Sequence, residues 1–128
     1  MIVDIEKLKD IIEIEFSEIV EDVVLTDINE LRVALIDGSF IDVWFSLKLE
    51  RRYSYHWERK FIDGTIYRHD NAPHLRWQGV STFPKHFHDG SEDIVVSSHI
   101  SDNHESALKE FLNFASERIK KEEPPKGP

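Results

Sequence analysis

The hydrophobic positions follow a helical period at both ends of the chain. In residues 4–17 (DIEKLKDIIEIEFS), apolar side chains recur every three or four positions, the spacing of an amphipathic helix. Asp4 precedes this run and is suited to cap the helix N-terminus. Residues 103–120 show the same spacing after a polar stretch that supplies capping side chains. Both ends of the chain are therefore predicted to be helices.

Between these helices, residues 19–69 carry runs rich in β-branched and aromatic side chains, which predict strands. Two Asp-Gly pairs, Asp37–Gly38 and Asp63–Gly64, separate such runs. Asp-Gly favours two-residue hairpins because both central positions of a type I′ turn need a positive φ. Consecutive hairpins predict an antiparallel meander.

Residues 71–89 contain two prolines and one glycine without a sustained period, which predicts a long loop over 70–91 of the kind that often carries function. A short strand is expected over 93–98, and a frayed tail over 121–128. The prediction is one α+β domain over 1–128, with an antiparallel sheet of five to six strands and both helices packed on one face.

The strand predicted over 52–61 has two unlike faces. Tyr53, Tyr55 and Trp57 alternate with polar residues and share one face. These aromatics either pack in the core against the helices or form a platform that stacks unpaired RNA bases, and both interpretations stay open. Arg51 and Arg52 precede the strand and are read either as a solvated edge or as phosphate-binding groups.

Composition limits the class of protein. The chain has 128 residues, 40% hydrophobic and 32% charged, as in a folded globular domain. It lacks cysteine, which excludes disulfides and thiolate metal sites, and it has neither an apolar run of membrane-spanning length nor a signal-like start. We therefore expect a cytoplasmic protein without a membrane partner.

Charge is unevenly distributed. The net charge is −9, which argues against general nucleic-acid affinity. Residues 46–89, however, hold eight basic and five acidic residues, a local balance of +3 that leaves −12 for the rest. Five of the seven histidines lie in the same segment. The basic, aromatic middle is the part suited to bind RNA or an acidic partner.

The candidate chemistry lies in the predicted loop. Asp70 and His74 begin it, and His86 and His88 follow in FPKHFHDG. If the loop folds back, these side chains meet: an aspartate orients an imidazole, histidines transfer protons, and an arginine holds phosphate. The predicted catalytic residues are Asp70, His74, His86 and His88, and the predicted phosphate-binding residues are Arg51, Arg52, Arg68 and Arg76.

Simpler interpretations also stay open for these residues. Asp70 supports a turn, and the histidines bond to backbone groups. His86 and His88, two apart, would face the same way on an extended segment and share a metal or a phosphate. Because the chain has no cysteine and no helical H-x-x-x-H pattern, no metal and no cofactor is predicted. No phosphate-binding Gly-rich loop or G-x-S-x-G elbow is present either, which argues against ATP and serine hydrolysis.

Three segments, RYSYHWERK, GTIYRHDNAPH and STFPKHFHDG, together resemble the TumE family of small bacterial and archaeal proteins. The resemblance covers about the second half of the chain. This chain departs from the family pattern at Leu75, where an aromatic or a second histidine is common, and at Lys85, where the family often has histidine. The family pattern falls on Arg68, Asp70, Asn71, Ala72, Pro73, His74, Thr82, Phe83, Pro84, His86 and His88.

The resemblance implies the toxin of a toxin–antitoxin pair, with a DNA-binding antitoxin as partner. Whether the chain is an enzyme stays open. One hypothesis is a histidine-dependent ribonuclease. A second is a non-catalytic binding module that docks a partner protein or nucleic acid through the basic, aromatic middle. A third is a domain that forms a homodimer through an exposed sheet edge.

Overall fold

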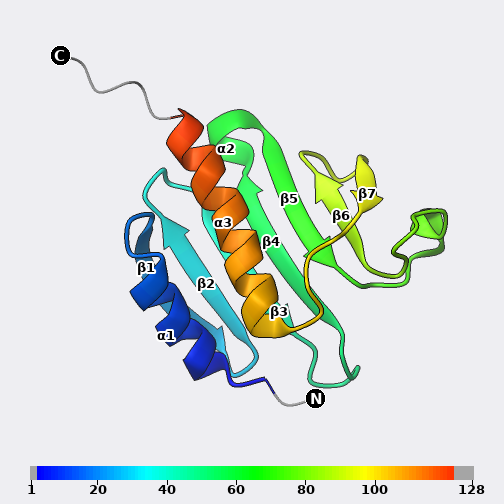
Figure 1. Ribbon diagram of the computed structural model, residues 1–128, viewed down its shortest axis with the longest axis horizontal. Helices are drawn as coiled ribbons and strands as arrows, with labels where there is room; N and C mark the ends of the chain where they lie inside the picture. Colours follow the sequence, from blue (N-terminus) through cyan, green and yellow to red (C-terminus); the bar gives the residue numbers. More distant parts are fainter. Residues whose placement is uncertain (1–2, 123–128) are drawn as a thin grey trace.

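The computed structural model describes residues 3–122, which form one seven-stranded antiparallel sheet and two long helices (Figure 1). Sequential strands are neighbours throughout, in the order β1-β2-β3-β4-β5-β6-β7. The elements are α1 (Ile5–Glu15), β1 (Val20–Asp27), β2 (Glu30–Leu35), β3 (Phe40–Phe45), β4 (Tyr53–Arg59), α2 (Lys60–Asp63), β5 (Thr65–Asp70), η1 (Leu75–Trp77), β6 (His86–Asp89), β7 (Val95–Ser97) and α3 (His104–Glu122).

The predicted α+β fold with an antiparallel sheet is confirmed, but the predicted number of strands is wrong. The segment 70–91, expected to be one loop, contains η1 and the strand β6, which pairs with β5. This strand is four residues long and three of them are polar or charged, so no hydrophobic alternation marked it. The tail predicted over 121–128 is helical at its first two residues, and 123–128 lie outside the described residues.

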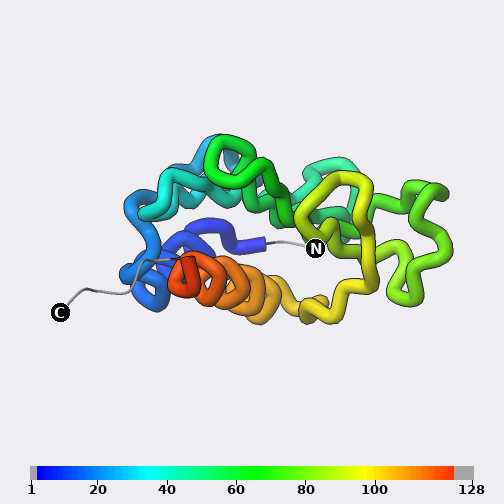
Figure 2. Tube along the Cα trace, turned by 90° about the horizontal axis from the view of Figure 1, so that it is seen from above, coloured from blue at the N-terminus to red at the C-terminus, as the bar shows by residue number. Residues whose placement is uncertain are grey.

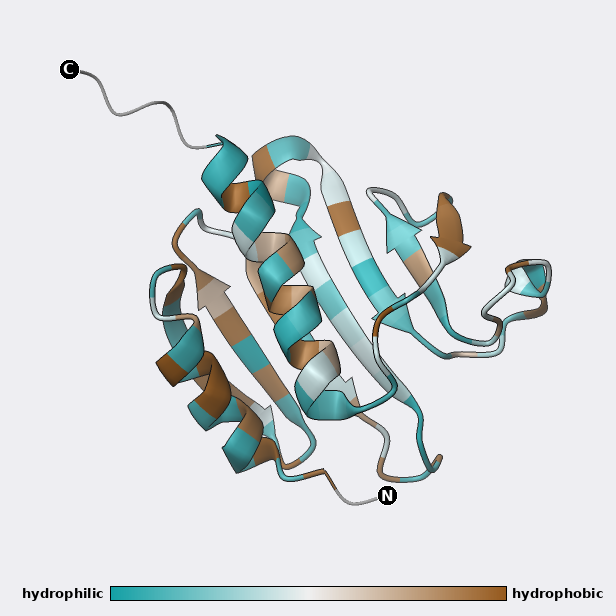
Figure 3. Cartoon of the chain, viewed as in Figure 1, coloured by the Kyte–Doolittle hydropathy of each residue, from teal (hydrophilic) through white to brown (hydrophobic). Residues whose placement is uncertain are grey.

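One face of the sheet is covered by α1 and α3, which lie on the same side of it in Figures 1 and 2. Hydrophobic and hydrophilic residues alternate along β2 and along α3 (Figure 3), as expected of elements with one buried side. Among residues 3–122, no helix is long and apolar enough to cross a membrane. The core joins both helices to the strands through Leu8, Ile12, Leu31, Val33, Ile41, Val43, Tyr55, Trp57, Leu108, Phe111 and Leu112.

The two faces of β4 are those that its alternation predicts. Tyr53, Tyr55 and Trp57 are buried in the core, whereas the intervening side chains are half-buried on the other side of the sheet. Burial rather than base stacking therefore explains these three aromatics. We call the side of the sheet opposite α1 and α3 the open face.

The Asp63–Gly64 pair does not form the predicted two-residue hairpin. The strand ends at Arg59, and residues 60–63 make the short helix α2, whose C-cap Gly64 has φ 78°. The Asp63 carboxylate accepts hydrogen bonds from the Thr65 backbone N–H and hydroxyl, which starts β5. The glycine is required here because its left-handed conformation is costly for other residues.

This conformation yields a stability prediction. Gly64→Ala is expected to lower the free energy of unfolding by about 1 kcal/mol, because alanine resists a positive φ. The matched control is Gly79→Ala, where an added Cβ meets no atom within 4 Å and φ is not in the left-handed range. Urea denaturation of both variants measures the difference. Equal stability of the two would contradict the assigned C-cap.

Candidate active site on the open face

The register of β5 and β6 places four of the predicted residues side by side. Arg68 and Asp70 lie two apart on β5, and their partners on β6 are His88 and His86. Residues two apart in a strand share a face, and here that face is the open one. These four residues, Arg68, Asp70, His86 and His88, are called the open-face centre below.

Asp70 connects the two histidines. Its Oδ1 lies 3.2 Å from His86 Nε2, and its Oδ2 lies 3.6 Å from His88 Nε2. All three side chains are buried, with relative exposures of 6%, 0% and 4% for Asp70, His86 and His88. Such burial of a carboxylate is costly unless the charge is compensated.

The surroundings of Asp70 keep its carboxylate ionised. Burial alone would raise its pKa, but the nearby His88, the hydrogen bond from the Ala72 N–H, and the adjacent His86 and Arg68 outweigh it. The pKa of Asp70 is consequently lowered from its ordinary value. The open-face centre therefore presents a buried anion.

Backbone carbonyls fix the tautomer of both histidines. His86 Nδ1 lies 2.8 Å from the Pro84 carbonyl oxygen, and His88 Nδ1 lies 3.0 Å from the Glu92 carbonyl oxygen. A carbonyl only accepts, so each Nδ1 carries the proton and donates it. In the neutral rings the unprotonated Nε2 atoms then face Asp70, and the arrangement is suited to receive a proton or another cation.

Arg68 is held by carboxylates on two sides. Its Nε donates to Asp70 Oδ2 at 3.2 Å, and its two terminal nitrogens donate to the two carboxylate oxygens of Glu92. It also contacts His56 Nδ1 at 3.2 Å and His88 Nε2 at 3.4 Å. The predicted phosphate-binding arginine is thus already engaged within the protein.

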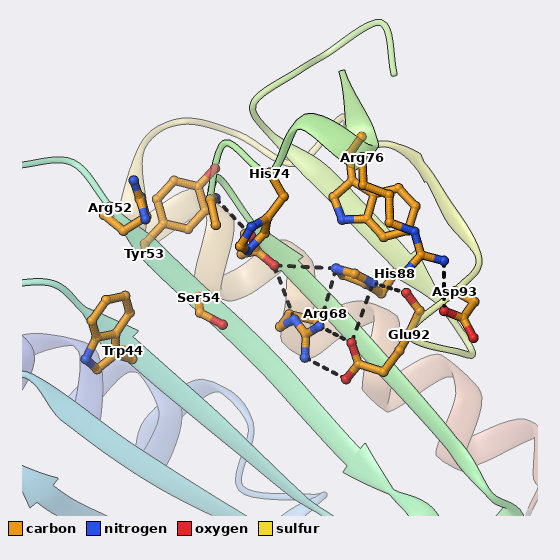
Figure 4. A pocket seen from close by; sticks show the side chains of 13 residues that line it. Trp44, Arg52, Tyr53, Ser54, Arg68, His74, Arg76, His88, Glu92 and Asp93 are labelled. Carbon is orange, nitrogen blue, oxygen red and sulfur yellow. Dashed lines mark hydrogen bonds and ion pairs between the residues drawn. The ribbon is translucent and has the colours of Figure 1, made fainter. Parts of the chain in front are cut away.

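The open-face centre forms part of the wall of a pocket of about 550 Å³. Figure 4 shows Arg68, His88 and Glu92 pointing toward one another, with His74 and Arg76 coming from the segment that follows β5. The pocket is lined by Trp44, Arg52, Tyr53, Ser54, Arg68, Asp70, Ala72, His74, Arg76, Trp77, His88, Glu92 and Asp93. Most of the predicted site residues therefore surround one cavity.

Comparison with known proteins identifies the family at this point. The model of the family described as Toxin TumE matches residues 5–119. The chain belongs to the TumE family. No curated protein and no solved structure gives a significant match.

The TumE-like segment DNAPH contributes both to the candidate site and to the backbone contacts of β4. Asp70 belongs to the open-face centre. Asn71 binds the backbone at the beginning of β4: its Oδ1 accepts from the Tyr53 N–H at 3.0 Å, and its Nδ2 donates to the Arg51 carbonyl at 2.7 Å. His74 is exposed at the pocket. The turn-forming interpretation therefore holds for Asp70 and Asn71, whose side chains accept backbone N–H groups, and a catalytic role of Asp70 and His74 stays a prediction.

The remaining predicted residues of this TumE-family chain lie in different surroundings. Arg76 is exposed and pairs with Asp93 at 3.1 Å. Arg52 lines the pocket, whereas the adjacent Arg51 lines a neighbouring hollow. The structure therefore brings Arg52 and Arg76 to the pocket and leaves Arg51 apart from it.

Sequence reasoning missed several residues at this candidate site. Trp44 and Trp77 line the pocket, and Glu92 holds Arg68. The alternation of β3 would have put Trp44 on the open face, but no local pattern indicates Trp77 or Glu92.

The neighbouring His69 does not belong to this pocket. It lies on the covered face, where its Nδ1 is 2.7 Å from Ser98 Oγ, and burial lowers its pKa to about 3.

Proposed function

We propose that this chain is the toxin of a toxin–antitoxin pair and that it cleaves RNA at the open-face centre. Its membership of a toxin family supports the first part. The observation that carries the second is a buried carboxylate faced by two histidine Nε2 atoms and an arginine, at the edge of a pocket with further cationic and aromatic side chains. Clustered, perturbed ionisable groups of this kind are typical of active sites.

The pocket lining suits single-stranded RNA. Arg52 and Arg76 present guanidinium groups that bind phosphate, and Trp44 and Trp77 present aromatic rings on which unpaired bases stack. Arg52, Arg76 and Trp77 lie within residues 46–89, the basic part of an otherwise acidic chain. Such a local site binds a few nucleotides without a general affinity for nucleic acid.

Cleavage would proceed by attack of a ribose 2′-oxygen on the adjacent phosphorus. The bond from phosphorus to the 5′-oxygen breaks, one group accepts the 2′-hydroxyl proton, and another returns a proton to the 5′-oxygen. His74 and His88 line the pocket for proton transfer, while Asp70 and the fully buried His86 orient the open-face centre. Arg52, which lines the same pocket, would stabilise charge that develops on the phosphate, because the donors of Arg68 are held by Asp70 and Glu92.

Expression in cells tests this function. Growth arrest with new RNA ends is expected for the native chain, and His74→Ala should reduce the yield of cleaved RNA by about 100-fold. His99, which is exposed and outside the pocket lining, provides the control His99→Ala. Arrest with intact RNA would overturn the ribonuclease and favour the binding-module alternative.

The neighbouring arginines provide a second test, because only Arg52 lines the pocket. Arg52→Glu is expected to weaken binding of a single-stranded RNA at least about tenfold, and Arg51→Glu to weaken it less. Fluorescence anisotropy with a 2′-O-methyl RNA, which lacks the nucleophile, measures binding alone. Equal losses in both variants would show general basic attraction instead of a pocket.

The toxin family implies an antitoxin as partner. The proposal extends to a DNA-binding antitoxin encoded beside this gene, and to action in the cytoplasm, where cellular RNA is available. Co-expression of that neighbour should restore growth and form a complex with the toxin. An adjacent gene that neither binds nor protects would contradict this pairing.

A further inference from the structure

We propose that Asp70, His86 and His88 bind a divalent first-row transition-metal ion, with Zn²⁺ as the probe. This ion would be a cofactor at the same site. Its role in catalysis rests on the proposed function, whereas its binding does not. The proposed site replaces the metal-free expectation drawn from the sequence. Two imidazoles and one carboxylate are a donor set that such ions accept.

The separations of the donor atoms fit one ion. Bonds of about 2.0–2.2 Å in a tetrahedral arrangement put neighbouring donor atoms roughly 3.3–3.6 Å apart. The two oxygens of Asp70 lie 3.2 Å and 3.6 Å from the Nε2 atoms of His86 and His88, and one donor atom from each of the three residues lies within 4.8 Å of the others. Small movements of the side chains would complete the coordination.

The orientation of the rings gives an independent argument. His86 Nε2 is buried and has no hydrogen-bond partner among the described residues, although it faces the Asp70 carboxylate. Since Nδ1 donates to the Pro84 carbonyl, Nε2 is the ring atom that faces the carboxylate at 3.2 Å, which is the position of a metal-binding lone pair. A metal ion satisfies both groups at once.

The hydrogen bonds around the donors are those of metal ligands. Metal-bound histidines commonly donate their second ring N–H to a carbonyl, which fixes the ring and its tautomer. His86 and His88 do so toward Pro84 and Glu92, and Asp70 Oδ1 accepts from the Ala72 N–H at 2.9 Å. Each donor residue therefore enters the site already oriented.

The site also leaves room for substrate. Asp70 and His88 line the pocket, whereas His86 does not, so an ion bound to all three would have its open side toward the pocket. Three protein ligands with an open position characterise catalytic zinc sites. When bound, the ion would polarise a phosphoryl oxygen. His88 would then serve as a ligand, so His74 would accept the 2′-hydroxyl proton and, as the imidazolium, return it to the leaving 5′-oxygen.

Arg68 is the competing cation in this region. It contacts Asp70 Oδ2 and His88 Nε2, but its terminal nitrogens are also held by Glu92. If the ion displaced Arg68 from Asp70, the guanidinium would still be paired with Glu92, and its charge would remain compensated. Arg68→Gln is therefore expected to retain or increase affinity for the metal.

Calorimetric titration of the metal-stripped, untagged chain with Zn²⁺, in the absence of RNA, tests the site. One ion per chain is expected, with a rise in unfolding temperature. His86→Ala and Asp70→Asn should each weaken binding at least about 10-fold, while His99→Ala should leave it unchanged. Circular dichroism and thermal unfolding establish that each variant is folded.

The outcomes separate this inference from the proposed function. No zinc binding, or binding that survives both His86→Ala and Asp70→Asn, overturns the metal site. RNA cleavage by protein that binds no metal would also overturn it and keep the ribonuclease. Specific zinc binding without RNA cleavage would support the metal site and contradict the proposed function.

Discussion

Asp70→Asn is expected to reduce RNA cleavage at least about 100-fold while the protein stays folded. Asparagine keeps the size of the side chain and still accepts the Ala72 N–H. It removes the charge that faces His86, His88 and Arg68. Those groups then lose the anion that orients them, and a bound cation loses its carboxylate ligand.

Asp42 supplies the matched control for this substitution. It lies on the same open face but on β3, where its carboxylate pairs with Arg32 at 2.8 Å and 2.9 Å. Asp42→Asn removes an equal charge outside the pocket lining and should keep cleavage within about twofold of the native rate, because exposed ion pairs contribute little. Comparable loss in both variants would show a general charge effect.

Phe111→Ala is expected to lower the free energy of unfolding by about 3–5 kcal/mol. This α3 side chain is fully buried, with an exposure of 0%, and its ring packs against Tyr55 of the sheet with ring centroids 6.0 Å apart. Truncation leaves a cavity between the helix and the sheet. A loss of this size is a large part of the total stability of a small domain.

The same substitution at an exposed phenylalanine is the control. Phe61 in α2 has a relative exposure of 104%, so Phe61→Ala should change the unfolding free energy by no more than about 0.5 kcal/mol. Urea denaturation followed by circular dichroism measures both. Similar losses, or a Phe111→Ala loss below about 1 kcal/mol, would contradict the described core.

Local patterns were sufficient where alternation was strong. Along β4, the period of two placed Tyr53, Tyr55 and Trp57 on one face, which the structure buries in the core. Asp37–Gly38 lies between β2 and β3 as predicted, although only Gly38 of the pair has the positive φ expected of both. His86 and His88 share a face because they are two apart on an extended segment. These features depend on neighbours in sequence, which the sequence displays directly.

The contacts that assemble the site depend on pairing between distant segments. The short polar strand β6 forms because its backbone pairs with β5 on one side and with β7 on the other. The sequence HFHD by itself does not indicate this pairing. Arg68 meets Glu92 across 24 positions, and this pairing occupies the arginine that was expected to bind phosphate. The orientation of the His86 and His88 rings toward Asp70 likewise follows from the positions of the Pro84 and Glu92 carbonyls, which only the folded chain defines.

The most direct test of the central claim is incubation of the purified native chain with total cellular RNA, with Zn²⁺ supplied, beside Asp70→Asn. Multiple-turnover cleavage by the native chain, with loss of at least about 100-fold in the variant, is the predicted result. RNA that stays intact at equimolar protein, or cleavage that Asp70→Asn retains, would contradict catalysis at the open-face centre.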